Sequence, residues 1–368
     1  MNAQQRVQRY LDHLIEGGQE TGLQVAAYVR GQPVVNASAG VADQYTGRTV
    51  DHRTLFHSWS TGKSMTSTVI HVLAERGLLD YDTPVSDYWP EFAAHGKHRV
   101  TVAHVLTHRA GVPQAPDGTS AADLGDWDGM CARIAALPLL WEPGTATGYH
   151  ALTFGYILGE VVRRATGRPI AEVLRKDIAE PLSIADELFF GVPPAHHDRI
   201  ARLEDGNWSD ALTARPADSL FFRAAPRAVQ PCAALGNRPD YLSIDVPCAG
   251  TMTAHAAARM YAAMTRDIDG VRLISAERLA HVAHVATTDV DLVLGAPIPK
   301  CLGYFSGLPE FGSHPGAFGC KGSGGSIAFA DPGSDLAIAF THNRMAAPPQ
   351  DLAAHIANHV RDALAPRR

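Results

Sequence analysis

Two residues at the start of an apolar stretch carry side chains that could perform nucleophilic chemistry together. Ser60 and Lys63 are three positions apart in the sequence WSTGKS, where the apolar spacing predicts a helix from Thr61 to about Arg76. Positions i and i+3 of a helix share a face, so the hydroxyl and the amine can point into one cavity. A lysine amine that takes the hydroxyl proton makes the oxygen a nucleophile. The alternative is that Ser60 caps the helix while Lys63 extends into solvent.

A tyrosine in the middle of the chain is the second candidate for this chemistry. Tyr149 lies in a glycine-bounded turn just before a predicted helix in residues 151–169. A phenol at this position could exchange a proton with Lys63 and with the leaving group of a substrate. The alternative is an ordinary half-buried tyrosine. His150, which follows Tyr149, and Trp59, which precedes Ser60, are candidates for contact with the substrate.

The third candidate element is the glycine-rich run FGCKGSGGSIAFADP, residues 318–332. Its glycines leave backbone exposed, so a substrate can lie along the strand, and an N–H group there could hold the negative charge of a reacting carbonyl oxygen. The alternative is a glycine-rich bulge without a catalytic role. We expect the thiol in this run to line the site without covalent chemistry. The predicted substrate-contacting residues here are Cys320, Lys321, Gly322, Ser323 and Gly324.

Helices are predicted at both ends of the chain and around the candidate residues. Residues 4–16 carry apolar side chains at helical spacing, and a last helix is expected at about 350–364. The helix in residues 151–169 should end at Gly167 and Pro169. Two β-rich runs on either side of residues 30–32 predict a hairpin.

The C-terminal part of the chain returns to β structure. Residues 300–307, 325–332 and 336–343 are short alternating or apolar runs divided by glycine, proline and aspartate. Residues 196–240 lack clear periodicity, which predicts long loops over the surface or over a site. We therefore expect one α/β (α+β) domain, residues 1–368. Its sheet region is expected at about 1–58 and 295–368, and its helical region at about 59–294.

The composition restricts the partners of the protein. Its 368 residues include 46% hydrophobic and 19% charged residues, a mixture able to bury a large core. A net charge of -6 argues against nucleic-acid and anionic membrane partners. The five scattered cysteines, the absence of an apolar leader and the lack of a membrane-spanning run predict a cytoplasmic protein. His104 and His108 have a spacing that a metal could use, but without an HExxH pattern we expect hydrogen bonding or packing instead.

In their order along the chain, the three elements resemble motifs of the serine β-lactamase and penicillin-binding protein family, in particular its class C-like esterase and transacylase branch. The S-x-x-K motif falls on Ser60-Thr61-Gly62-Lys63, the tyrosine motif on Tyr149, and the glycine-rich strand on residues 318–326. The resemblance covers nearly the whole chain. It implies a β-lactamase-like antiparallel sheet flanked by the terminal helices, with an inserted helical subdomain and the site between them.

The resemblance also implies roles for individual residues. Ser60 would be the nucleophile, Lys63 and Tyr149 the proton-handling pair, and the backbone N–H groups of Ser60 and Ser323 the oxyanion hole. It implies no metal and no organic cofactor. Two positions depart from the family's motifs: Ala151 replaces the asparagine of Tyr-x-Asn, and Cys320 replaces the lysine or histidine of the strand motif.

Lys321 is displaced by one residue from that position, so the sequence leaves open whether Lys321 or Cys320 takes the cationic role. The departures favour a small ester or amide, or another activated acyl substrate, over cell-wall or antibiotic substrates. We predict acyl transfer through a Ser60 acyl-enzyme, ending in hydrolysis. The alternative is a transacylase that passes the acyl group to an amine or alcohol in small-molecule biosynthesis, and a further one is a catalytically silent binding protein.

Overall fold

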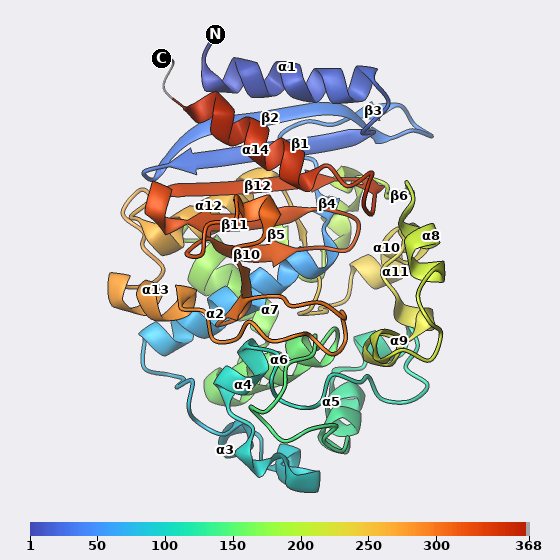
Figure 1. The fold of residues 1–368 in the computed structure, drawn as a ribbon, viewed down its shortest axis with the longest axis vertical. Coiled ribbons are helices and arrows are strands. Elements are labelled where there is room, and N and C mark those ends of the chain that lie inside the picture. Colours follow the sequence, from blue (N-terminus) through green and yellow to red (C-terminus); the bar gives the residue numbers. More distant parts are fainter. Residues whose placement is uncertain (366–368) are drawn as a thin grey trace.

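A large antiparallel sheet organises the molecule (Figure 1). The computed structural model describes residues 1–365. The strand order is β3-β2-β1-β12-β11-β10-β9-β8, so strands from the two ends of the chain meet where β1 pairs with β12. The strands are β1 (Gly22–Val29), β2 (Gln32–Asp43), β3 (Arg48–Thr49), β8 (Lys300–Cys301), β9 (Tyr304–Ser306), β10 (Phe318–Lys321), β11 (Ile327–Asp331) and β12 (Leu336–His342).

The hairpin between β1 and β2 follows from its turn residues. Arg30 and Gly31 have φ angles of 51° and 79°, the left-handed values that a two-residue type I′ turn requires at both positions. The predicted hairpin around residues 30–32 is thereby confirmed. Almost every residue of β1 is buried, as expected for a strand with neighbours on both sides and layers on both faces.

The sheet lies between two layers of helices. The terminal helices α1 (Ala3–Glu16) and α14 (Ala353–Leu364) share one layer: in Figure 1 α14 crosses in front of β1 and β2, and α1, at the top, contacts β2 as well as α14. The apolar side chains of Val7, Leu11 and Ile356 share one core with Ile338 of β12. On the other face, α12 (Ala254–Thr265) packs against β1, β11 and β12. The predicted class, an antiparallel sheet flanked by the terminal helices with helices beside it, is confirmed.

The helical part is built around α2 (Lys63–Glu75) and α6 (Thr153–Thr166), which contact each other. α6 ends at Gly167, whose φ of 71° is the left-handed cap that the sequence predicts. Residues 196–240, expected as long loops, instead contain short helices, and four to six residues are too few for helical periodicity to show. The remaining helices are α3 (Val85–Tyr88), α4 (Val102–Leu106), α5 (Trp127–Ala135), α7 (Ile170–Leu174), α8 (Trp208–Thr213), α9 (Leu220–Ala224), α10 (Ala233–Gly236), α11 (Pro239–Leu242) and α13 (Ala276–Ala283).

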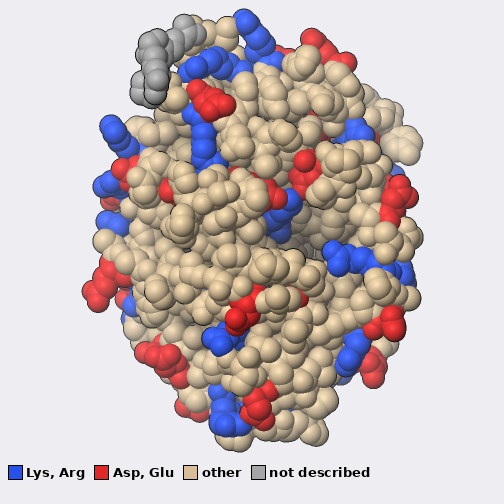
Figure 2. Space-filling view, viewed as in Figure 1, with Lys and Arg blue, Asp and Glu red and all other residues tan. Residues whose placement is uncertain are grey.

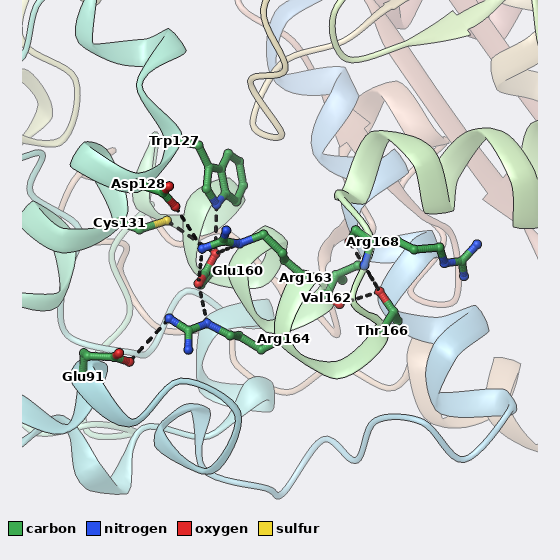
Figure 3. A network of polar contacts seen from close by, with 10 residues as sticks. All are labelled: Glu91, Trp127, Asp128, Cys131, Glu160, Val162, Arg163, Arg164, Thr166 and Arg168. Atoms are coloured by element: carbon green, nitrogen blue, oxygen red, sulfur yellow. Dashed lines mark hydrogen bonds and ion pairs between the residues drawn. The ribbon is translucent and has the colours of Figure 1, made fainter.

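A buried carboxylate ties α6 to α5 (Figure 3). The side chain of Glu160 has no exposed surface. It accepts hydrogen bonds from Trp127 Nε1 at 2.8 Å, Arg163 Nε at 2.7 Å and Arg164 Nε at 2.7 Å. Burial alone raises the pKa of the Glu160 carboxyl, but the hydrogen bonds from these donors lower it by more, so the net pKa shift is downward. The network therefore keeps Glu160 ionised and joins two helices of the helical part.

A buried histidine predicts how stability depends on pH. His71 on α2 is fully buried, with Nδ1 2.8 Å from the Tyr81 hydroxyl and Nε2 3.1 Å from the Leu302 carbonyl oxygen. Burial lowers the pKa of His71 to about 3. Since the unfolded chain protonates this imidazole near pH 6.5, the unfolded state binds the proton first as the pH falls. The stabilisation is therefore complete above pH 6.5 and is lost progressively between pH 6.5 and 3.

We expect His71→Gln to reduce the pH dependence of the free energy of unfolding. One such group contributes about 1.4 kcal/mol per pH unit, or about 2 kcal/mol between pH 6.5 and pH 5. Urea denaturation of both proteins at pH 7 and pH 5 measures this difference. The control is His98→Gln, at an exposed position, which should have the same pH dependence of the free energy of unfolding as the wild type. Equal pH dependence in the wild type and His71→Gln would contradict the prediction.

The surface carries charges of both signs. Figure 2 shows acidic and basic side chains interspersed over one face of the molecule. No helix among residues 1–365 is long and apolar enough to cross a bilayer.

Candidate functional site

The candidate nucleophile lies on a constrained turn between strand β4 (Phe56–His57) and helix α2. Ser60 belongs to a short 3₁₀ turn, Trp59–Gly62, and the preceding Trp59 has a φ of 48°. A bulky residue rarely adopts a left-handed φ, so the surrounding structure must hold this backbone in place. Hydrogen bonds from Ser58 N to Gly250 O at 2.8 Å and from Gly250 N to Trp59 O at 3.0 Å do so. The turn presents the Ser60 hydroxyl at the start of α2.

Lys63 lies directly beside this hydroxyl. Its Nζ atom is 3.2 Å from Ser60 Oγ and 3.1 Å from the carbonyl oxygen of Cys248. Lys63 is only 3% exposed, so the amine contacts the serine rather than solvent. The alternative that Lys63 extends into solvent is therefore wrong.

Tyr149 completes a group of three side chains. Its ring centroid lies 4.8 Å from Lys63 Nζ. Burial raises the pKa of the Tyr149 phenol, and this effect exceeds the lowering caused by the Lys63 charge and by hydrogen bonding with Ser60 and Lys63. The ring also stacks near Phe305 of β9 and lies 4.8 Å from the His108 ring, centroid to centroid. A neutral phenol is thus held beside the amine and the hydroxyl.

The glycine-rich strand end packs against the nucleophile turn. A Cβ atom at residue 322 would lie 2.1 Å from the carbonyl oxygen of Ser58, so only glycine allows this approach. Thr61 Oγ1 donates a hydrogen bond of 3.0 Å to the carbonyl oxygen of Ser326, which ties the turn to the same segment. Ser323, between these contacts, lines the same cavity as Ser60. Gly324 has a φ of 93° and shapes the segment rather than lining the cavity.

The cavity beside Ser60 is mostly apolar. Trp59, Tyr149 and Ala151 line it together with Ser60 and Ser323. Several lining residues come from segments in which the sequence analysis predicts no site residue. Residues 196–240 supply five of them. Short helices in a region without periodicity offer no sequence signal for this role. The further lining residues are Leu124, Leu152, Phe221, Ala225, Val229, Gln230, Pro231, Tyr241, Cys248, Ala249 and Val293.

His150 does not contact the cavity, so the prediction that it binds substrate is wrong. The residue is fully buried, and Nδ1 lies 2.6 Å from the Gly148 carbonyl oxygen while Nε2 accepts a hydrogen bond of 3.2 Å from Val112 N. Burial lowers the pKa of His150 to about 4, which leaves it neutral. Both ring nitrogens fix the turn around Tyr149, and successive residues of that turn point in different directions.

Lys321 also lies away from the site, which corrects its assignment as a substrate contact. Its Nζ forms ion pairs with Asp351, at 2.5 Å, and with Glu310. Burial lowers the pKa of Lys321, but the two carboxylates raise it more, so the net shift is upward. Successive strand residues point to opposite faces of a sheet. Lys321 therefore faces the layer of the terminal helices, whereas Cys320 faces the core that contains α2 and α12.

Cys320 is buried behind the catalytic candidates and does not line the cavity. Burial raises the pKa of its thiol to about 12, so the sulfur stays protonated and unreactive. Neither residue of the Cys320-Lys321 pair presents a cation to the cavity. His104 caps α4, since its Nδ1 accepts a hydrogen bond of 3.2 Å from Thr101 N. No cluster of three metal-binding side chains occurs among residues 1–365.

Comparisons with known proteins agree with this architecture. The family model described as Beta-lactamase matches residues 7–361. The esterase/beta-lactamase LipL of Mycobacterium tuberculosis is 37% identical over 365 residues, which cover 93% of this chain and 81% of that protein. The crystal structure of a family VIII carboxylesterase has a TM-score of 0.89 and 32% identity, covering 99% of this chain and 98% of that chain. A penicillin-binding protein homolog from Caulobacter crescentus has a TM-score of 0.86, 32% identity and the same coverage of both chains.

The chain therefore belongs to the Beta-lactamase family. It is a hydrolase of the esterase/β-lactamase type.

Proposed function

We propose that this protein is a serine esterase that acts through an acyl-enzyme on Ser60. The observation that carries the proposal is the 3.2 Å contact between Lys63 Nζ and Ser60 Oγ, at the edge of an apolar cavity that Tyr149 also lines. A nucleophile, a base and a second proton carrier within reach of one another are what acyl transfer requires.

The first half of the reaction forms the acyl-enzyme. Ser60 Oγ bonds to the carbonyl carbon as its proton passes to the amine form of Lys63, and the carbonyl electrons move onto the oxygen. The backbone N–H groups of Ser60 and Ser323 stabilise this oxyanion. The intermediate expels the alkoxide, which takes the proton of the Tyr149 phenol. Tyr149 serves as the acid because its raised pKa keeps it protonated at neutral pH.

The second half restores the enzyme. The Lys63 ammonium returns a proton to the Tyr149 phenolate, and the amine is again ready to act as a base. Water then attacks the acyl-serine, giving its proton to this pair, and the carboxylic acid leaves as Ser60 regains its hydrogen. An amine or alcohol in place of water would give acyl transfer, the alternative outcome. Adding short alcohols to the assay and measuring the ratio of ester to acid distinguishes the two.

The cavity supports a small neutral substrate. Its lining is dominated by apolar side chains, and Ala151 offers no amide group to a polar substituent. Lys321, the cation nearest in sequence to the family's carboxylate-binding position, is bound by two carboxylates on the other face of the sheet. A substrate carboxylate entering this cavity would lose its hydration without gaining a cationic partner.

We therefore expect p-nitrophenyl butyrate to be a better substrate than nitrocefin, a chromogenic β-lactam with a carboxylate. A missing charge-assisted hydrogen bond is worth about 1.5–3 kcal/mol, or on the order of 10- to 100-fold in kcat/KM. Steady-state hydrolysis of both compounds measures the ratio. Intact-protein mass spectrometry during ester turnover should also find a single butyryl adduct. A kcat/KM for nitrocefin equal to that for the ester would contradict the proposed substrate class.

The close packing of Gly322 predicts a specific loss of activity. In Gly322→Ala the added methyl group would collide with the Ser58 carbonyl oxygen, so the strand end must retreat and carry the Ser323 N–H away from the oxyanion. We expect kcat to fall about 10²- to 10³-fold, as when one oxyanion donor is removed.

The matched control is Gly319→Ala, on strand β10 three residues before Gly322, where a Cβ atom would lie 2.3 Å from Phe329 Cβ. It introduces a similar collision away from the nucleophile turn, so its melting temperature should fall while most of kcat remains. An unchanged kcat in Gly322→Ala, or equal losses of kcat in both variants, would refute the assignment of the oxyanion donor.

A further inference from the structure

A buried carboxylate that the sequence did not single out lies next to the backbone of Tyr149. Asp291 belongs to the loop between α13 and β8, and it has no exposed surface. Its Oδ1 atom accepts hydrogen bonds from Tyr149 N at 3.0 Å, Val293 N at 2.9 Å and Leu294 N at 2.8 Å. One oxygen therefore fastens two segments that are 142 residues apart in the chain.

The second oxygen of this carboxylate is balanced by a lysine. Asp291 Oδ2 lies 3.0 Å from Lys300 Nζ, and the Lys300 side chain is only 1% exposed. A buried carboxylate is strongly destabilising without such partners. Hydrogen bonds from N–H groups to a carboxylate are stronger than those between neutral groups, so the three bonds to Oδ1 hold the loop and the Tyr149 backbone firmly together.

Further contacts hold the same turn. Leu292 N donates to Thr147 O at 2.9 Å, and Gly148 N donates to His108 O at 3.0 Å. The backbone just before Tyr149 is thus held by two segments, the loop that carries Asp291 and the segment after α4. Val293, whose N–H binds the same Asp291 oxygen, lines the cavity with Tyr149.

We infer that Asp291, balanced by Lys300, is a positioning residue that sets the location of the Tyr149 phenol and of the cavity wall at Val293. The inference rests on the proposed function, since it assigns Asp291 a role through Tyr149. Capping the loop needs only the bonds to Val293 and Leu294. The third bond, to Tyr149 N, links the loop to the residue that exchanges protons with Lys63. A displacement of about 1 Å at such a residue can reduce a rate on the order of 100-fold.

Two paired substitutions separate positioning from a general effect on stability. Asp291→Ala with Lys300→Met removes the acceptor and the cation together, so no unpaired charge remains buried. Asp291→Asn with Lys300→Met also removes both charges but keeps an oxygen that can accept from Tyr149 N. For p-nitrophenyl butyrate we expect the alanine pair to lose about 10- to 100-fold in kcat with KM nearly unchanged. The asparagine pair should recover most of this kcat.

Glu160→Gln is the matched control. Glu160 is also a fully buried carboxylate with several donors, but it lies outside the cavity. It should lower the melting temperature while kcat, measured well below that temperature, stays near the wild-type value. If the alanine pair keeps wild-type kcat, or if the asparagine pair loses as much kcat as the alanine pair, the positioning role is overturned.

The wild type separates this inference from the function on which it rests. A wild type without ester turnover or a Ser60 adduct overturns the proposed function itself, whereas an active wild type with an equally active alanine pair overturns only the role of Asp291. Should the alanine pair fail to fold, amide hydrogen exchange of wild-type Tyr149 provides the test. Positioning requires this exchange to be slow, and fast exchange overturns it.

Discussion

Replacing Ser60 with alanine is expected to reduce ester turnover by more than about 10⁴-fold and to abolish the acyl adduct. The hydroxyl oxygen is the proposed reacting atom, and it lies 3.2 Å from Lys63 Nζ. The change removes one partly exposed oxygen and leaves the packing of α2 intact. Steady-state hydrolysis and intact-protein mass spectrometry measure the two effects.

The control for this substitution is Ser64, at the start of helix α2, which follows the turn that carries Ser60. Ser64 is buried, and its Oγ donates a hydrogen bond of 2.6 Å to the Thr61 carbonyl oxygen, away from the cavity. Ser64→Ala should therefore retain most of the turnover. Residual activity above one hundredth of the wild-type rate in Ser60→Ala, or an adduct that persists in this variant, would show that another residue is the nucleophile.

Replacing Lys63 with methionine is expected to lower kcat by about 10²- to 10⁴-fold, the usual contribution of a general base. Methionine fills a similar volume and is compatible with the buried position, but it cannot accept the Ser60 proton. The burst of p-nitrophenol that reports acylation should slow by the same factor, because the lysine acts in the step that forms the acyl-enzyme. Pre-steady-state kinetics measures this burst.

A second buried lysine provides the matched control. Lys97 is fully buried, and its Nζ donates to the carbonyl oxygens of Leu137 at 2.5 Å and Ala94 at 2.6 Å, outside the cavity. Burial lowers the pKa of Lys97 to about 8. Lys97→Met should change stability but keep kcat. If both methionine variants lose kcat equally, the effect of Lys63 is structural and the proposed base is wrong.

Much of the fold was predictable because its signals are local. The terminal helices, the hairpin at residues 30–32 and the end of α6 at Gly167 follow from apolar spacing and from residues that tolerate left-handed backbone. The short helices in 196–240 were missed, since four to six residues do not complete enough turns to display a period. Side chains of this segment, both within and between its short helices, nevertheless form part of the cavity wall.

The same distinction between local and long-range signals applies to the candidate site. Ser60 and Lys63 could be paired from the sequence because one helical turn fixes their relation, whatever the rest of the chain does. The directions of His150 and Lys321 could not be derived in this way. They depend on the path of a turn and on the strand's register against its neighbours, and the structure directs both side chains away from the cavity.

The types and spacing of the residues indicate which chemistry is available: a serine one turn from a lysine, a tyrosine in a turn, and a glycine-rich strand, in an order typical of one family. Which of these groups meet depends on tertiary packing. Packing brings the Tyr149 ring centroid to 4.8 Å from Lys63 Nζ and Gly322 into contact with the Ser58 carbonyl oxygen. It also places Asp291 within hydrogen-bonding distance of Tyr149 N. These contacts join segments far apart in the chain, and their geometry follows from how whole layers pack, which no local pattern of residues specifies.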